Sequence, residues 1–361
     1  MKRRVVVVGC AMALLVGLAA TPARAEHGAA RPLVVVMTND AAANEIKVYD
    51  GVSHALLQTL STHGKGGVAG NARGVRQYEG RLFAAVNFGS GTVSLFRRVD
   101  DRLKYEGSVA TSSNPVSVDF GNDHMYVAGT STVDSFTLRG NGVGWNDGTT
   151  TLALAGGGAP PAGSTAQIGV LDRSHLLVTL KTDPSPGTVD VVTLDHGAVS
   201  GLPPQAVSAP AGSLTPFGFS VYRDGTALIT LAHSNQDALF RNGAFVAVAA
   251  AMQAADCWST RVGKYVFTAN TGSRTISRVV GTGNNVFIDA QVAASIPTGG
   301  PSDIDAEAGV MAVVDHAAGM SHLTLLTYNA FGELAVSGGA IDLGAANANG
   351  VAVIPGRDSD D

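Results

Sequence analysis

One arrangement of apolar and polar positions recurs along the chain: a continuous apolar run, a small or amide residue, a Gly/Ser turn and then an alternating strand. Residues 82–96 (LFAAVNFGSGTVSLF) align without gaps on residues 265–279 (YVFTANTGSRTISRV). Looser copies surround five further positions, namely Asn39, Gly129, Lys181, His233 and Asp315. Seven copies, spaced by about 40–50 residues, have the period of a β-propeller blade.

Each copy predicts four short strands. An innermost strand begins at a Gly or Pro, as at residues 115–118 and 216–221, and leads into a tight turn such as Asp224-Gly225. The second strand is apolar throughout, which is typical of a strand buried on both faces. The third strand alternates apolar and polar residues, and the fourth, as at residues 56–60 or 291–296, is weaker. We therefore predict an all-β, seven-bladed propeller of four-stranded antiparallel blades.

The two ends of the chain predict how the ring closes. Residues 33–38 read as a second strand without a first strand before it, and residues 349–354 read as a first strand without a second. If they pair, the ring is closed and an exposed strand edge is removed. The propeller is thus predicted over residues 26–355, and residues 356–361 as a disordered acidic tail.

Three segments depart from the repeat. Residues 154–167 and 196–213 are rich in Gly, Pro and Ser, which predicts long flexible connections between blades. A functional lid is the other interpretation of these two segments. Residues 247–255 are rich in alanine and are interpreted as a linker between blades in preference to a helical turn.

The N-terminal 25 residues have the pattern of a secretory signal peptide. Basic residues 2–4 precede an apolar stretch at residues 5–20, and Ala23-Arg24-Ala25 is a small-residue cleavage site. We expect cleavage after Ala25 and export to the periplasm or the medium of a bacterium. Sec export is the favoured route, and the Arg3-Arg4 pair leaves twin-arginine export open.

Charge and cysteine content exclude several classes of function. Cleavage would leave 20 basic residues against 29 acidic ones, and an acidic surface disfavours nucleic acid and anionic membranes as partners. After Ala25 no other apolar run is long enough to span a bilayer. The mature chain would hold one cysteine, Cys257, so an intrachain disulfide is excluded. No cofactor or metal-binding motif occurs, and nothing indicates an oligomer, so a monomer is expected.

A propeller gathers side chains from distant parts of the sequence at the mouth of its channel. The loops that precede first strands and those that follow second strands meet at the same mouth, where convergent polar groups are the default binding site. Five residues at these positions are candidate catalytic groups: Lys181, His233, Asp315, His316 and Arg73. A histidine near a carboxylate can act as a general base, and a cation can stabilise an oxyanion. The alternative is that these are ordinary exposed loop residues.

Five further residues at the same positions are candidate ligand-binding groups. Asn39, Asn87 and Asn270 recur at one place in the repeat and either face a ligand or bond the backbone of their own turns. Trp258 either stacks on a ligand or plugs the channel. Asp303, with the aspartate two residues later, is a fragment of a metal site or, as we favour, a strand residue with a solvated carboxylate.

The phrase at 265–277, and less closely that at 82–96, resembles the YVTN-type repeat of lactonase-like seven-bladed propellers. That group includes 6-phosphogluconolactonase and the carboxymuconate-cyclising enzymes. The resemblance implies the propeller fold and is compatible with an enzyme that opens or closes a lactone ring. Enzymes of the group tend to carry a histidine in a Pro-x-His-Val innermost strand, whereas residues 114–118 here read NPVSV.

Two functions therefore remain open. The missing innermost histidine favours an exported protein that binds a small polar ligand or an extracellular protein at its channel mouth. The alternative is a lactonase or cyclase that acts on a small lactone or carboxylate.

Overall fold

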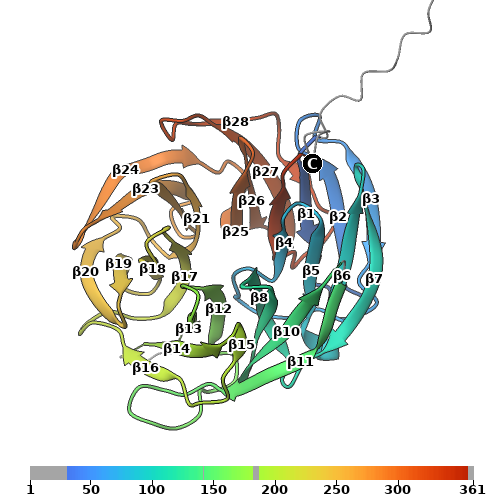
Figure 1. Ribbon diagram of the computed structural model, residues 1–361. Coiled ribbons are helices and arrows are strands. Elements are labelled where there is room, and N and C mark those ends of the chain that lie inside the picture. Colours follow the sequence, from blue (N-terminus) through green and yellow to red (C-terminus); the bar gives the residue numbers. More distant parts are fainter. Residues whose placement is uncertain (1–30, 141, 182–186, 357–361) are drawn as a thin grey trace, which may run out of the picture.

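The described residues form a ring of seven small antiparallel sheets (Figure 1). The computed structural model describes residues 31–140, 142–181 and 187–356, so the predicted signal peptide and residues 357–361 of the predicted tail lie outside it. The innermost strands of blades 1 to 7 surround a central channel, and they are β30 (Val351–Ile354), β4 (Val75–Tyr78), β8 (Pro115–Gly121), β12 (Thr165–Val170), β17 (Pro216–Val221), β21 (Asp256–Val262) and β25 (Gly300–Glu307).

The other strands follow outward in sequence order. The second strands are β1 (Leu33–Met37), β5 (Leu82–Asn87), β9 (His124–Gly129), β13 (His175–Leu180), β18 (Ala227–Leu231), β22 (Tyr265–Asn270) and β26 (Val310–Ala317). The third strands are β2 (Glu45–Asp50), β6 (Thr92–Val99), β10 (Thr132–Arg139), β14 (Thr188–Asp195), β19 (Gln236–Arg241), β23 (Thr275–Thr282) and β27 (Met320–Tyr328). The outermost strands are β3 (Leu56–Ser61), β7 (Arg102–Ala110), β11 (Gly142–Thr151), β15 (Ala198–Val199) with β16 (Gln205–Ser208), β20 (Ala244–Ala250), β24 (Asn285–Ser295), and β28 (Leu334–Val336) with β29 (Ile341–Asp342).

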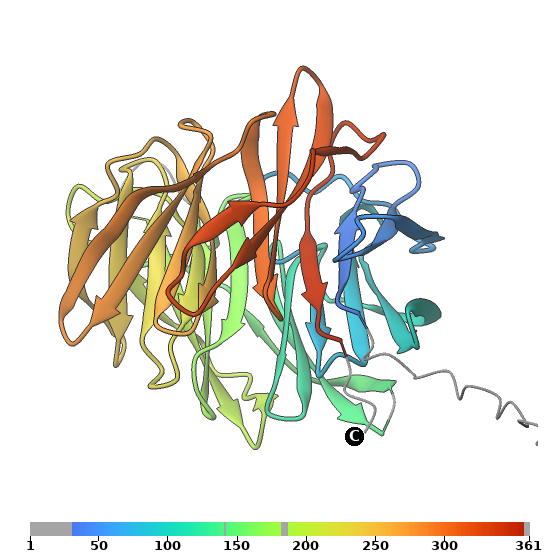
Figure 2. The ribbon, with the colours of Figure 1, turned by 90° about the horizontal axis from the view of Figure 1, so that it is seen from above.

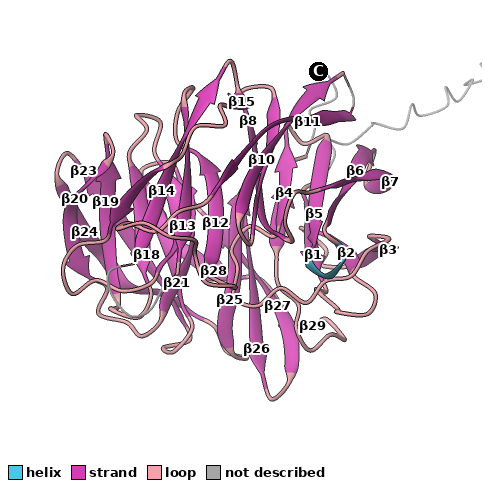
Figure 3. Cartoon of the chain, turned by 90° about the horizontal axis from the view of Figure 1, so that it is seen from below, coloured by secondary structure: helices cyan, strands magenta, loops and turns pink. Residues whose placement is uncertain are grey.

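The predicted fold and ring closure are confirmed. β30 pairs antiparallel with β1, so the last strand of the chain completes the first blade. In the edge views the strands run across the thickness of a disc, and the connecting loops gather at its two faces (Figures 2 and 3). We call the end of the channel at which innermost strands begin the N-side mouth, and the end at which they finish the C-side mouth.

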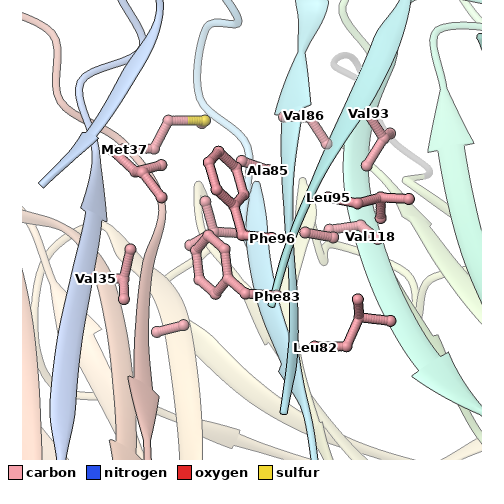
Figure 4. Packing of buried hydrophobic residues seen from close by; sticks show 14 of the residues in the cluster. Val35, Met37, Leu82, Phe83, Ala85, Val86, Val93, Leu95, Phe96 and Val118 are labelled. Atoms are coloured by element: carbon pink, nitrogen blue, oxygen red, sulfur yellow. The ribbon is translucent and has the colours of Figure 1, made fainter. Parts of the chain in front are cut away.

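Each second strand is apolar throughout because its two faces serve two different cores. Along β1, Leu33, Val35 and Met37 pack toward blade 2, whereas Val34 and Val36 pack toward blade 7. Alternate side chains of a strand point to opposite faces, so a strand between two neighbouring blades must be apolar at every position. Figure 4 shows the first of these cores, where the rings of Phe83 and Phe96 meet edge to face with centroids 6.0 Å apart.

Neighbouring innermost strands belong to different sheets, and side chains bridge them at the channel. The Asp303 carboxylate of β25 accepts the Val351 N–H of β30 at 3.1 Å. The Asp305 carboxylate accepts the Val353 N–H at 2.9 Å. These aspartates provide acceptors for buried backbone N–H groups that no strand partner satisfies. They therefore fix the closing strand to blade 7.

All three predicted connections contain strand residues. Residues 247–250, which we interpreted as a linker, belong to β20, and both β15 and β16 lie within the predicted flexible connection 196–213. Outermost strands are solvated on one face and carry small or polar residues, so their apolar pattern is too weak to identify them. The predicted connection 154–167 has no assigned strand as far as residue 164, but its last three residues belong to β12.

Helical structure is almost absent from the described residues: η1 (Phe88–Ser90) is the one short 3₁₀ turn there. Within the same residues no helix has the length and apolarity needed to cross a bilayer.

Candidate functional site

The segment between β3 and β4 enters the N-side mouth and blocks the channel. Asn39 holds it by donating from Nδ2 to the Val68 carbonyl at 2.8 Å and by accepting the N–H groups of Gly67 and Val68. Deeper in the channel, the Trp258 indole N–H donates to the Asn71 carbonyl at 2.8 Å. The Asn71 side chain in turn bonds Asn349 of blade 1. The segment therefore separates the two ends of the channel.

Above this plug lies a cavity of about 680 Å³ at the N-side mouth. Blades 1, 6 and 7 and the segment 67–70 line it. The lining residues are Asn39, Ala41, Gly67, Val68, Ala69, Gly70, Trp258, Thr271, Gly272, Arg274, Gly300, Pro301, Ser302, His316, Asn347 and Asn349. We call it the N-side cavity. Its volume is within the range of small-molecule sites, and it contains one permanent charge, that of Arg274.

Three polar side chains of the N-side cavity have hydrogen-bonding capacity left for a ligand. Asn347 and Arg274 are exposed at the rim, and their side chains make no hydrogen bond within the described residues. His316 is half-buried, and its Nδ1 lies 3.2 Å from the Ser321 hydroxyl, which leaves Nε2 available. A guanidinium, an amide and an imidazole together suit a ligand rich in oxygen acceptors.

The predicted pair of Asp315 and His316 separates because adjacent strand residues point to opposite faces. His316 faces the N-side cavity, whereas Asp315 is fully buried. The Asp315 carboxylate accepts the Thr298 hydroxyl at 2.8 Å and lies 3.4 Å from Nδ1 of His322. His322, which stands opposite Asp315 on β27, is therefore the histidine near this carboxylate.

The other three catalytic candidates lie elsewhere. His233 is exposed on blade 5 and does not line the N-side cavity. The Lys181 ammonium donates to the carbonyls of Ala69, at 2.8 Å, and Gly70, and so holds the plug; burial lowers its pKa to about 8. Arg73 lines a separate cavity at the C-side mouth. The five candidates therefore do not meet in one site.

The side chains of the repeated asparagines are engaged within the protein. Asn87 and Asn270 are fully buried, and each Nδ2 donates to a third-strand serine, Ser94 at 2.7 Å and Ser277 at 2.8 Å. Asn39, as described above, holds the plug. Hence one of the three, Asn39, lines the N-side cavity, with its amide already engaged.

Trp258 and Asp303 both occupy the channel wall. Trp258 lies at the floor of the N-side cavity and contacts the Phe217 ring edge to face at 5.1 Å, so it contributes to both the plug and the lining. Asp303 is 2% exposed, in contrast to the solvated carboxylate that we favoured. Its burial raises the pKa to about 7.

Sequence reasoning missed Arg274 and Asn347. In the gap-free alignment Arg274 stands where blade 2 has Gly91, and both adopt a left-handed backbone, with φ of 58° and 64°. A non-glycine residue in this conformation is strained, and such strain is concentrated at functional sites. An arginine at the glycine position of a repeat was therefore a usable signal. For Asn347 the sequence offers none.

Metal ligation finds no support in the part of the chain that the structure describes, where no group of three or more His, Cys, Asp or Glu residues is close enough to hold an ion. Cys257 is partly buried, and its surroundings raise the thiol pKa to about 12, so a thiolate nucleophile is disfavoured at neutral pH.

Comparison with known proteins identifies the fold. No family model and no curated protein matches the chain. Among solved structures, a proposed 6-phosphogluconolactonase from Bacteroides fragilis superposes with a TM-score of 0.64 at 12% identity, covering 90% of this chain and 98% of its own. A proposed 6-phosphogluconolactonase from Bacteroides uniformis (TM-score 0.65, 13% identity) and a protein from Lactobacillus plantarum (0.65, 15%) each cover 90% of this chain and 99% of theirs. The lactonase-like seven-bladed fold is thus confirmed, and at these identities the likeness concerns the fold alone.

Proposed function

We propose that the protein binds a small, oxygen-rich molecule, such as a sugar or its lactone, in the N-side cavity and does not turn it over. The observation that carries the proposal is the chemistry of the lining: Trp258 at the floor, with Arg274, Asn347 and His316 offering free hydrogen-bonding groups. A large apolar surface with a few oriented polar groups is the usual composition of a ligand site.

Binding without turnover is favoured because the N-side cavity lacks the partners of a general base. Among the described residues that line it, His316 is the one imidazole and there is no carboxylate. A catalytic histidine is normally oriented by a third group, and the nearby Asp315 points away from the cavity.

A lactonase is the second candidate. Its support is the fold shared with the proposed 6-phosphogluconolactonases and the position of His316 in the cavity. In this version His316 Nε2 acts as base toward a water molecule and Arg274 stabilises the oxyanion.

One experiment separates the two. The mature protein is titrated calorimetrically with a panel of aldonolactones and sugars, while hydrolysis of the lactones is followed by acid release. We expect binding without hydrolysis, and about tenfold weaker binding for His316→Ala or Asn347→Ala. The matched control is His233→Ala at the same mouth but outside the cavity, which should bind as the wild type does.

Two outcomes would contradict the proposal. Lactone hydrolysis that is lost in His316→Ala and kept in His233→Ala would establish the enzyme. Wild-type binding that neither His316→Ala nor Asn347→Ala weakens would place the ligand elsewhere.

Export remains part of this proposal on sequence grounds. The basic, apolar and Ala-x-Ala features of residues 1–25 support it. N-terminal sequencing of the protein recovered from the periplasm or medium should give Glu26 as the first residue.

A further inference from the structure

A second cavity, of about 310 Å³, lies at the C-side mouth. The innermost strands of blades 2 to 7 all contribute to it, so it surrounds the central axis. Its lining residues are Arg73, Arg76, Gln77, Asp119, Phe120, Val170, Ser220, Val221, Thr260, Arg261, Asp305, Ala306 and Glu307. It shares no residue with the N-side cavity, and we call it the C-side cavity.

The two aspartates of the C-side cavity, Asp119 and Asp305, already have their partners. Asp119 accepts from Arg76 Nε at 2.9 Å through one oxygen and from the Val170 N–H at 3.0 Å through the other. Asp305 accepts the Val353 N–H at 2.9 Å through Oδ2, and its Oδ1 lies 3.6 Å from Arg76 Nη1. The Arg76 guanidinium thus lies between the carboxylates of Asp119 and Asp305.

Arg73 is the exception in this network. Its guanidinium makes no hydrogen bond within the described residues; the nearest carboxylate oxygen, on Asp119, is 3.7 Å away, and the Phe219 ring centroid is 5.8 Å away. The Arg73 side chain is 17% exposed. Burial, with Arg76 nearby, lowers its pKa to about 10, so it stays charged at neutral pH. The long ion pair with Asp119 offsets part of its charge, but its five N–H donors stay unused, which is costly for a largely buried guanidinium unless an acceptor approaches through the cavity.

The charged side chains around Arg73 indicate which anionic group of a ligand it would bind. A guanidinium presents paired parallel N–H groups that match a planar carboxylate in a bidentate arrangement. The lining is balanced in charge, because its three arginines (Arg73, Arg76 and Arg261) match its three acids (Asp119, Asp305 and Glu307). A monoanion therefore leaves one negative charge in excess in the C-side cavity, whereas a phosphate dianion leaves two. We propose that the C-side cavity binds a small organic carboxylate, with Arg73 as the residue that holds the carboxylate group.

Glu307 should make the C-side cavity prefer some small carboxylates over others. It is exposed at the rim of the C-side cavity and forms no ion pair within the described residues. An anion at the rim above a cation at the floor is complementary to a molecule that carries an ammonium group beside its carboxylate. Among small carboxylates, α-amino acids should therefore bind more tightly than hydroxy acids of equal size.

The test is an NMR or calorimetric titration of the mature protein with glycine, glycolate, acetate and inorganic phosphate. Wild type should bind the three carboxylates, glycine most tightly, and phosphate most weakly. Arg73→Gln should weaken carboxylate binding at least tenfold, and Glu307→Gln should remove the preference for glycine over glycolate. The matched control is Arg173→Gln, an exposed arginine in the loop between β12 and β13 on the same face.

Three results would overturn the proposal: no carboxylate binding by the wild type, phosphate binding tighter than any carboxylate, or equal carboxylate binding by wild type and Arg73→Gln. If Arg73→Gln does not fold, Arg73→Lys is used in its place. The lysine keeps the positive charge but lacks the paired N–H groups of a guanidinium. Unchanged carboxylate affinity in Arg73→Lys would also overturn the proposal. His316→Ala should leave carboxylate binding unaffected, so this test is independent of the N-side cavity.

Discussion

Asp237 of β19 and Asp256 of β21 form a buried acid pair between blades 5 and 6. Both side chains are fully buried, and none of their carboxyl oxygens has a partner in good hydrogen-bonding geometry within the described residues. The Thr268 hydroxyl acts on Asp256 in the direction that lowers its pKa. Burial raises the pKa of both, and the charge of Asp237 raises that of Asp256 further. The pair is satisfied when one carboxyl group keeps its proton and donates to the other.

We predict that Asp256→Asn stabilises the protein at pH 8. The amide cannot ionise and supplies the N–H donor that the pair lacks, so about 1–3 kcal/mol should be gained. At pH 5, where the pair already holds a proton, the change should be small. Thermal unfolding at both pH values measures this, and a lower Tm for the variant at pH 8 would contradict it.

The control is a buried aspartate that has donors of its own and lies, like Asp237, on a third strand. Asp134 of blade 3 accepts the Ser112 N–H at 2.8 Å and the hydroxyls of Ser112 and Thr149 at 2.6 and 2.7 Å. Because Asp134→Asn loses acceptor capacity there, it should lower the Tm at both pH values.

Arg274 links backbone strain to binding. Its φ of 58° is costly for a residue with a Cβ, and the equivalent residue of blade 2 is Gly91. Arg274→Gly should therefore raise the free energy of unfolding by about 1 kcal/mol while it weakens binding in the N-side cavity. Chemical denaturation and ligand titration of the same sample test both parts. A destabilised variant would show that the arginine contributes more through its contacts than it costs in strain.

The closing strand β30 is the element on which the ring depends. It pairs with β1, and its N–H groups are held by Asp303 and Asp305. Truncation after Ala348 should expose the apolar β1 edge and give an aggregated or molten protein. Truncation after Gly356 keeps β30 and should leave the Tm unchanged. Size-exclusion chromatography and thermal unfolding compare the two, and a monomeric, cooperatively folding first truncation would contradict this role.

The sequence predicts the inner elements well and the outer ones poorly. Second strands such as β5 and β22 lie between two cores, so burial imposes the apolar run that repeats along the chain. Outermost strands such as β16 and β20 pack on one face, and small residues serve there as well as large ones. Burial therefore restricts the choice of residues less in outermost strands, and their apolar pattern in the sequence is weaker.

For the candidate site, the sequence predicts which loops meet but not where side chains point. His316 lies at the N-side mouth because its strand ends there. Asp315 faces the other way because one residue along a strand reverses the face. Lys181 and Arg73 are long enough to reach either the plug or the channel, and only the packing of the segment 67–73 decides between them.

Across the whole molecule, buried carboxyl groups should make stability fall as the pH rises from 5 to 8. Burial raises the pKa of Asp190 to about 6 and of Asp303 to about 7, and the buried acid pair is shifted in the same direction. The usual aspartate value is 3.8, so the folded state holds protons that the unfolded chain has released. The stabilisation that these groups contribute is therefore full below about pH 4 and is lost as the pH rises to about 7 and beyond.

Carboxyl groups with lowered pKa values do not oppose this trend within the same window. Asp50 and Asp147, whose pKa values are lowered in the folded state, lose their stabilising effect only when the pH falls below about 4. Each proton held costs about 1.4 kcal/mol of unfolding free energy per pH unit, and each kcal/mol corresponds to about 2–4 °C in a large domain. The Tm of the mature protein should thus be several degrees lower at pH 8 than at pH 5, with a shallower slope in Asp256→Asn. A Tm that rises over this range would mean that these carboxyl groups are solvated or paired with cations in the folded protein.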